Sequence, residues 1–222
     1  IEAAGLDAAA HRRFLTGFYT GRYDGSFARG LPFQEHPDTG DARISGTCAS
    51  LAGLEKGLEQ NDTEAIEHAI QRILLIHGLI LPVGGIPLIY LGDESGMLND
   101  YDYERDTDKI GDTRWLPRAT FDWELAAQRR DSTTVPARSY QNLLRLIQIR
   151  QQNPALDRAE TEFVDTGNPH VFGYFRTNGD YSVLVLANFS TTPQHLEGRR
   201  LRLLGLRKSN VDLVAGRVII AA

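Results

Sequence analysis

The stretch Gly85-Ile86-Pro87-Leu88-Ile89-Tyr90-Leu91-Gly92-Asp93-Glu94 places an apolar run directly before a glycine and two carboxylic acids. A parallel strand that is buried on both faces reads as a continuous apolar run of this kind. In (β/α) barrels the loops that carry function follow the carboxyl ends of the strands. We therefore expect residues 85–91 to form a barrel strand and functional groups to lie just after Leu91.

Helical patterns lie on both sides of this segment. Residues 62–81 carry apolar side chains at helical spacing, Asp62 is placed to cap the first turn, and Pro82-Val83-Gly84-Gly85 ends the pattern. Three more helices are predicted over residues 6–20 with Asp7 as the cap, 45–58 and 139–152. Helix, short turn and strand in this order are typical of a βα repeat.

From Thr161 onward the spacing of apolar residues changes from helical to alternating. Thr177-Asn178-Gly179-Asp180 separates two alternating runs, and its Asn-Gly centre predicts a tight hairpin. Further short strands are expected at Leu196 and over residues 201–204, 211–214 and 218–220, with Arg199, Arg200 and Arg202 on the solvated face of a strand. The sequence thus predicts an α/β protein: the C-terminal portion of a (β/α)8 TIM barrel over residues 1–155, then an all-β antiparallel sandwich domain over residues 156–222.

Composition narrows the classes of partner. A net charge of −5 and a pI near 5.7, without a basic block, argue against general affinity for nucleic acid or for an anionic membrane. No apolar stretch reaches the roughly 18 to 20 residues that a membrane span needs. The single cysteine, Cys48, excludes an internal disulfide, and a cytoplasmic location fits best, although secretion is not excluded. A first residue of Ile1 without a signal peptide suggests an internal cut.

The acidic run after the apolar stretch allows more than one interpretation. Its carboxylates at Asp100, Asp102, Glu104, Asp106, Asp108 and Asp112 suggest a calcium loop, because hard cations prefer clustered oxygens. Counted from Asp100, however, the glycine of an EF-hand loop is replaced by Arg105 and its final glutamate by Gly111. The alternative is a solvated loop that Arg105, Lys109 and Arg114 partly neutralise.

Arg114 in Asp112-Thr113-Arg114-Trp115 is the arginine of most interest. A guanidinium beside an indole can fork onto a carboxylate or a pair of hydroxyls while the indole holds its plane. The structural alternative is an internal ion pair with Asp112 or Asp108. No nucleophile elbow, phosphate loop, His-Glu-x-x-His motif or cysteine pair offers another site.

Several segments together resemble one family. Residues 85–94 resemble the eighth barrel strand of the α-amylase superfamily of glycoside hydrolases and transglycosylases. Within it, the amylosucrase family is indicated by His11-Arg12-Arg13-Phe14-Leu15, Asp24-Gly25-Ser26-Phe27-Ala28-Arg29-Gly30 with Pro32-Phe33-Gln34, Thr39-Gly40-Asp41-Ala42-Arg43-Ile44-Ser45-Gly46-Thr47, Leu98-Asn99-Asp100 and Asp112-Thr113-Arg114-Trp115. The resemblance covers residues 7–155 and extends more loosely over the β region.

The resemblance implies an enzyme that moves glucose from sucrose to a growing α-1,4-glucan with retained configuration. Retention requires two carboxyl groups about 5 Å apart. The family takes these groups from earlier barrel strands, which the resemblance places before Ile1. The implied partners are therefore sucrose, an α-glucan and the missing N-terminal part of the same barrel, with no cofactor. No principal catalytic carboxylate is expected in this chain, and Asp93 and Glu94 do not take that role.

What the resemblance assigns to this chain is the shell around the reacting groups. It implies that Arg114 pairs with an aspartate of the N-terminal half and closes the floor of the sucrose pocket around the glucosyl ring. Arg43 corresponds to an arginine on the acceptor side of the cleft, Arg12 to one further along the glucan track, and Gln34 to a weaker acceptor-side contact.

Two rival functions remain open at this point. A sucrose hydrolase differs only in that water, instead of a sugar acceptor, intercepts the glucosyl intermediate; Arg43 and Arg12 favour the acceptor. A noncatalytic glucan-binding fragment is the rival from another class. The resemblance also implies truncation at both ends, and an incomplete barrel exposes apolar edges. We therefore expect the isolated segment to be inactive and poorly soluble.

Overall fold

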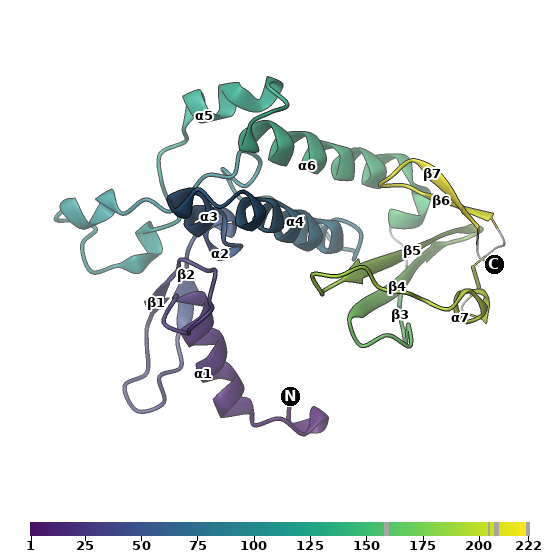
Figure 1. Ribbon diagram of the computed structural model, residues 1–222, viewed down its shortest axis with the longest axis horizontal. Coiled ribbons are helices and arrows are strands. Elements are labelled where there is room, and N and C mark those ends of the chain that lie inside the picture. The colour runs from purple at the N-terminus through teal and green to yellow at the C-terminus, as the bar shows by residue number, and fades with distance from the viewer. Residues whose placement is uncertain (158–159, 204, 207–208, 221–222) are drawn as a thin grey trace. The chain divides into compact units, whose positions relative to one another are not determined.

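The computed structural model describes residues 1–157, 160–203, 205–206 and 209–220. The chain divides into two compact units (Figure 1). The first unit comprises Ile1–Ile73 and Ile89–Tyr140, and the second comprises Leu74–Leu88 and Gln141–Ala222. The proposed domain boundary after residue 155 stays a prediction.

The first unit opens with a 3-10 turn, η1 (Glu2–Ala4), and helix α1 (Ala8–Tyr19). A carboxylate oxygen of Asp7 accepts hydrogen bonds from the amides of Ala9 and Ala10 at 2.8 and 3.0 Å, so the predicted cap is confirmed. Strands β1 (Leu31–Phe33) and β2 (Arg43–Ser45) follow as an antiparallel pair.

The helix predicted over residues 45–58 is in fact two helices, α2 (Cys48–Leu51) and α3 (Leu54–Gln60). Gly53 separates them with φ of 100°, a left-handed conformation that side chains disfavour. A Cβ there would also lie 3.1 Å from the side chain of Phe27. Backbone conformation and close packing both require glycine at this break.

Helix α4 (Thr63–Ile80) begins as predicted, with a carboxylate oxygen of Asp62 accepting from the amides of Glu64 and Ala65, each at 3.0 Å. Its first half joins α2 and α3 in the core of the first unit, which consists of Ala49, Ala52, Leu54, Ala69 and Ile73. Cys48 packs against this cluster, and burial raises the pKa of its thiol to about 12.

The remaining elements of the first unit lie in the chain after Ile89. They are η2 (Asp102–Arg105), η3 (Thr113–Trp115), α5 (Trp123–Ala127), η4 (Gln128–Arg130) and the start of α6 (Val135–Gln152). Helix α6 thus begins four residues before the predicted start at Ser139. None of the described helices has the length and apolar character needed to cross a bilayer.

Residues 85–91 do not form a strand, so the prediction of a barrel strand there was wrong for this structure. Tyr90 lies outside any sheet, and all strand pairs among the described residues are antiparallel. A β-strand requires hydrogen bonds to a neighbouring strand, and none of the described segments pairs with residues 85–91. As a result Ile86 is 98% exposed and Leu88 82% exposed.

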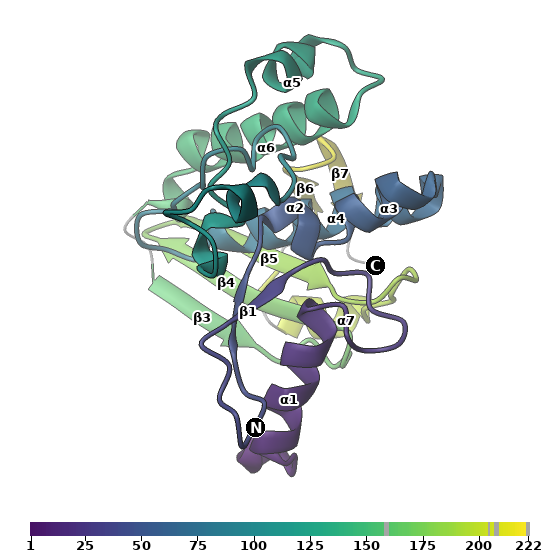
Figure 2. The same ribbon diagram turned by 90° about the vertical axis from the view of Figure 1, so that its left-hand side faces the viewer.

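The second unit contains the three-stranded antiparallel sheet β3 (Glu160–Val164), β4 (Val171–Asn178) and β5 (Tyr181–Asn188), which Figure 2 shows with its strands side by side. The predicted hairpin is confirmed, but its turn is shifted by one residue. Asn178 pairs with Tyr181, so the two-residue loop is Gly179-Asp180, with φ of 58° at Gly179.

The rest of the second unit departs from the predicted run of strands. It holds η5 (Pro154–Leu156), α7 (Gly198–Leu203) and the antiparallel pair β6 (Ser209–Asp212) and β7 (Arg217–Ile220). The strand predicted over residues 201–204 was wrong, because residues 201–203 end a helix; Leu204 lies outside the described residues. Leu196 is not in a strand either. The sandwich arrangement of the two sheets stays a prediction.

Candidate site around the first hairpin

The structure gives Arg114 a partner within its own turn. The Nε and Nη2 atoms of Arg114 donate to the two carboxylate oxygens of Asp112 at 2.8 and 2.7 Å, and Asp112 also caps η3 by accepting from the Arg114 amide at 3.0 Å. The side-chain hydrogen bond lowers the pKa of Asp112 to about 2 and raises the pKa of Arg114. The structural alternative for Arg114, an ion pair with Asp112, is therefore present.

This pair leaves part of the guanidinium available. A guanidinium has five N–H donors in a planar fork, and the Asp112 contact uses Nε and one side of Nη2. Within the described residues, Nη1 of Arg114 makes no hydrogen bond. The Arg114 carbon Cζ also lies 5.0 Å from the centre of the Phe33 ring, which gives the plane a second support.

Phe33 connects Arg114 to two other predicted site residues. It ends β1 directly opposite Arg43 in the hairpin register, and Gln34 follows it with φ of 55°. In the part of the chain that the structure describes, the side chains of Arg43 and Gln34 have no hydrogen-bond or ion-pair partner, and both are exposed. Their polar groups are thus open to a ligand.

Arg12 reaches the same region from α1. Its Nε lies 3.2 Å from a carboxylate oxygen of Asp41, two residues before Arg43. Both side chains are about half exposed, so this ion pair adds little stability. All four predicted residues, Arg114, Arg43, Arg12 and Gln34, therefore lie on or beside the β1–β2 hairpin.

The loop that carries Arg114 is attached to this hairpin by hydrogen bonds. The Thr113 hydroxyl donates to the carbonyl of Pro32 at 3.1 Å, from the residue before Arg114 to the residue before Phe33. Further back, the Asp100 amide donates to the Leu116 carbonyl at 2.9 Å and closes the loop at its base. The loop is thus bonded to the hairpin next to the Arg114 to Phe33 contact and is closed at its base.

Asn99 is the main link between the loop and the segment after β2. Its side-chain oxygen accepts from the Thr47 amide at 2.8 Å, and its side-chain nitrogen donates to the Arg29 carbonyl at 2.6 Å. The backbone N–H of Asn99 donates to the hydroxyl of Ser50 at 3.0 Å. One side chain therefore holds three segments that are far apart in the sequence.

Tyr101 extends this network to α3. Its hydroxyl donates to Glu55 at 2.7 Å, and Glu55 is buried. Burial, with the Glu55 hydrogen bond as a further contribution, raises the pKa of Tyr101 to about 12. The other carboxylate oxygen of Glu55 is buried without a hydrogen-bond partner within the described residues.

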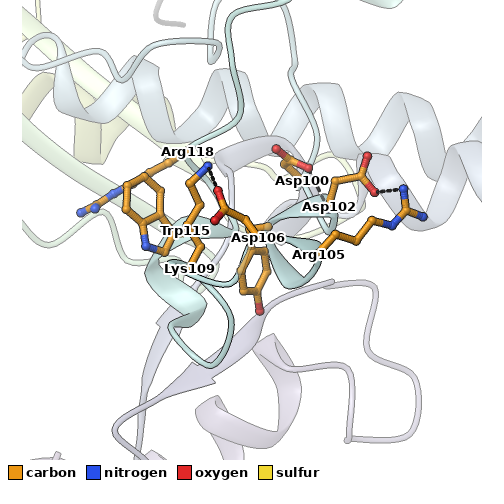
Figure 3. A pocket seen from close by; sticks show the side chains of 8 residues that line it. Asp100, Asp102, Arg105, Asp106, Lys109, Trp115 and Arg118 are labelled. Carbon is orange, nitrogen blue, oxygen red and sulfur yellow. Dashed lines mark hydrogen bonds and ion pairs between the residues drawn. The ribbon is translucent and has the colours of Figure 1, made fainter.

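A pocket of about 480 Å³ opens beside η3 (Figure 3). It is lined by Asp100, Asp102, Tyr103, Arg105, Asp106, Lys109, Trp115 and Arg118. Ion pairs cross its wall between Asp102 and Arg105 at 3.0 Å and between Asp106 and Lys109 at 2.8 Å. Lys109 and Arg118 also lie 5.2 and 5.4 Å from the Trp115 ring centre.

The acidic run does not assemble a metal site. Among the described residues, no group of three or more His, Cys, Asp or Glu side chains is placed to hold an ion. Glu94 is committed to its own turn, where a carboxylate oxygen accepts from the Gly92 amide at 2.9 Å.

Sequence reasoning assigned no role to Phe33, Asn99 or Tyr101. Asn99 is part of the motif Leu98-Asn99-Asp100, which supports the resemblance, but the motif did not indicate what Asn99 does. Nothing in the pattern around Phe33 indicates that its ring lies against a guanidinium from 81 residues away. Such a contact depends on the path of the loop, which hydrogen bonds such as that of Thr113 determine.

The curated proteins that the chain resembles include the following two enzymes. The chain is 29% identical over 154 residues to glucosylglycerate phosphorylase of Escherichia coli K12, a match that covers 68% of this chain and 27% of that protein. It is 46% identical over 52 residues to glucan 1,6-alpha-glucosidase of Streptococcus pneumoniae serotype 4, covering 23% of this chain and 10% of that protein. These matches support a member of the α-amylase superfamily. They do not single out amylosucrase, and no family model matches the chain.

Solved structures give weaker likenesses. A MutB variant in complex with the substrate sucrose has a TM-score of 0.43 and 22% identity, covering 55% of this chain and 30% of that chain. Isomaltulose synthase from Klebsiella sp. LX3 has a TM-score of 0.36 and 20% identity, covering 53% and 30%. Likeness at this level does not establish a shared function. The chain spans about a quarter of the length of the first curated relative, at 27%.

Proposed function

We propose that this chain forms the wall of a glucosyl-transfer pocket in an α-amylase superfamily enzyme that resembles amylosucrase. In this proposal glucose passes from sucrose to an α-1,4-glucan through a glucosyl-enzyme intermediate. The two carboxyl groups that retention requires come from polypeptide outside this chain. The single observation that carries the proposal is the placement of Arg114, Arg43, Arg12 and Gln34 around one hairpin.

In the proposed glucosyl-transfer pocket, Arg114 contacts the glucosyl ring. Asp112 holds its Nε and Nη2, Phe33 supports its plane, and Nη1 is available to a carboxylate or hydroxyl of the complete site. A guanidinium oriented in advance loses little side-chain entropy when it binds. It therefore stabilises the position of the sugar at low cost, while the carboxyl groups carry out the chemistry.

Arg43 and Gln34 serve the acceptor in this proposal. Both are exposed, and neither has a partner within the described residues. A sugar acceptor offers hydroxyl oxygens to such donors, whereas water needs no extended contact surface. This arrangement supports transfer over plain hydrolysis of sucrose.

The test is Arg114→Ala in the full-length enzyme that carries this chain, with Arg130→Ala as the control. Arg130 is an exposed arginine of the same unit, at the end of η4 and outside the pocket and the hairpin. We expect Arg114→Ala to abolish sucrose turnover, measured as fructose release, and Arg130→Ala to retain it. Near-normal turnover by Arg114→Ala would refute the assignment.

The longer of the two curated matches favours a second candidate, phosphorolysis, because that relative is a phosphorylase. Product analysis separates the candidates when the same enzyme receives sucrose with either maltoheptaose or inorganic phosphate. Elongated glucan supports transfer, free glucose supports hydrolysis, and glucose 1-phosphate supports phosphorolysis. Glucan binding without any turnover supports the noncatalytic alternative.

A further inference from the structure

The connection from Leu79 to Gly85, at the end of α4, is held by side chains from the rest of the second unit. The Tyr174 hydroxyl donates to the Leu79 carbonyl at 3.1 Å, and the Thr161 hydroxyl donates to the Val83 carbonyl at 3.0 Å. The last carbonyls of a helix have no intrahelical partner. Side chains of β3 and β4 thus satisfy carbonyls at and just beyond the end of this helix.

Arg150 of α6 donates two more hydrogen bonds to carbonyls of this connection. Its Nη1 donates to the Leu81 carbonyl, and its Nη2 donates to the Gly85 carbonyl at 2.9 Å. One planar guanidinium therefore bridges two carbonyls four residues apart. A lysine has a single charged nitrogen and lacks this fork.

Arg176 of β4 packs against the same turn. It is 3% exposed, its Nη1 donates to the Thr161 hydroxyl, and its Nε has no hydrogen-bond partner within the described residues. A Cβ on Gly84 would lie 3.2 Å from Nη1 of Arg176, and φ of Gly84 is 117°. The guanidinium occupies the space that a side chain at position 84 would need.

We propose that Arg150, Thr161 and Arg176 are positioning residues that fix the backbone course of the Leu79–Gly85 turn. The three-stranded sheet then acts as a clamp that holds this turn. The clamp sets the direction in which the chain enters the apolar segment 86–91. This inference is independent of the proposed function, since it concerns contacts within the second unit alone.

The first test compares Thr161→Val with Thr161→Ser in the full chain. Valine keeps the shape but removes the hydroxyl that joins Arg176 to the Val83 carbonyl, whereas serine keeps it. Amide exchange by NMR is followed at Leu81 and Val83, whose N–H groups bond to His77 and Leu79. Amides of the β4–β5 ladder report overall stability.

We expect Thr161→Val to accelerate exchange at Leu81 and Val83 by about tenfold, the size of one lost hydrogen bond, while the ladder amides change less. Thr161→Ser should restore the original rates. Equal acceleration at the ladder would mean a loss of general stability alone and would overturn the clamp, as would unchanged rates at both sites.

The second test covers the case in which Thr161→Val does not fold. Arg150→Lys keeps the charge but loses the fork, and Arg145→Lys on the same helix is the control, because Arg145 bonds to the distant Leu213 carbonyl. We expect Arg150→Lys to shift the amide resonances of Gly84 and Gly85 and to accelerate exchange at Leu81. Spectra of these residues identical to those of the control would contradict the proposal.

Discussion

At the scale of single residues, Arg114 closes an ion pair with Asp112, and its Nη1 remains without a partner among the described residues. The pattern Asp112-Thr113-Arg114-Trp115 allowed both an internal ion pair and a ligand contact. The ion pair is present, and the ligand contact stays a prediction. Which donors stay available depends on the side-chain rotamer, and sequence does not specify it.

A pH titration tests this pair. The usual pKa of an aspartate is 3.8, and the Arg114 hydrogen bond lowers that of Asp112 to about 2. Because the folded-state value is depressed, the contribution of the pair to stability is complete above pH 3.8 and is lost as the pH falls through about 2.

We therefore expect the Asp112 carboxyl carbon to titrate near pH 2 by NMR, and Arg114→Gln to move its pKa back toward 3.8. A midpoint for Asp112 that does not respond to Arg114→Gln would mean that the ion pair is absent in solution.

At the scale of elements, hydrogen bonds from Asn99 join the loop that carries Arg114 to two other segments of the first unit. Asn99 joins the Arg29 carbonyl and the Thr47 amide, and the start of α2 depends on the same residues. Loops without such links open easily, since few buried apolar contacts hold them.

Asn99→Ala should therefore destabilise the chain by about 2–4 kcal/mol, because it leaves the Thr47 amide and the Arg29 carbonyl without their partner. Urea unfolding measures the change. The control is Gln71→Ala, which removes an exposed amide that bonds to Glu67 on the same helix. Equal midpoints for the two variants would show that the Asn99 network adds no stability.

Local signals predicted elements well where one or two residues decide the structure. The caps Asp7 and Asp62 and the glycine turn after Asn178 belong to this class. The strand prediction over residues 201–204 was wrong because alternating Arg and Leu also suit a short helix, here α7, whose Arg200 pairs with Asp165 at 2.5 Å. A pattern this short does not distinguish period 2 from period 3.6.

At the scale of the whole molecule, the apolar segment 86–91 is the feature that sequence reasoning and structure describe differently. The sequence predicted a buried strand, and the structure leaves Ile86 and Leu88 almost fully exposed. Burial of a strand depends on neighbours from elsewhere in a sheet. The composition of the segment therefore favours a buried strand, but it does not show which other strands would pair with it.

This exposure predicts self-association of the isolated chain. Ile86→Ser with Leu88→Ser should reduce the sedimenting mass in analytical ultracentrifugation, because exposed apolar segments of this kind pair between copies. The control is Ile110→Ser, which removes an isolated exposed side chain, 63% accessible, in the site loop. A wild-type chain that stays monomeric at high concentration would contradict this expectation.

The division into two units has a practical consequence for spectroscopy. The chain has two tryptophans, Trp115 and Trp123, and both belong to the first unit. Indole fluorescence excited at its red edge will therefore follow the melting of that half alone, while far-ultraviolet circular dichroism follows both. A difference between the two melting curves would reveal whether the halves lose their structure in one cooperative step.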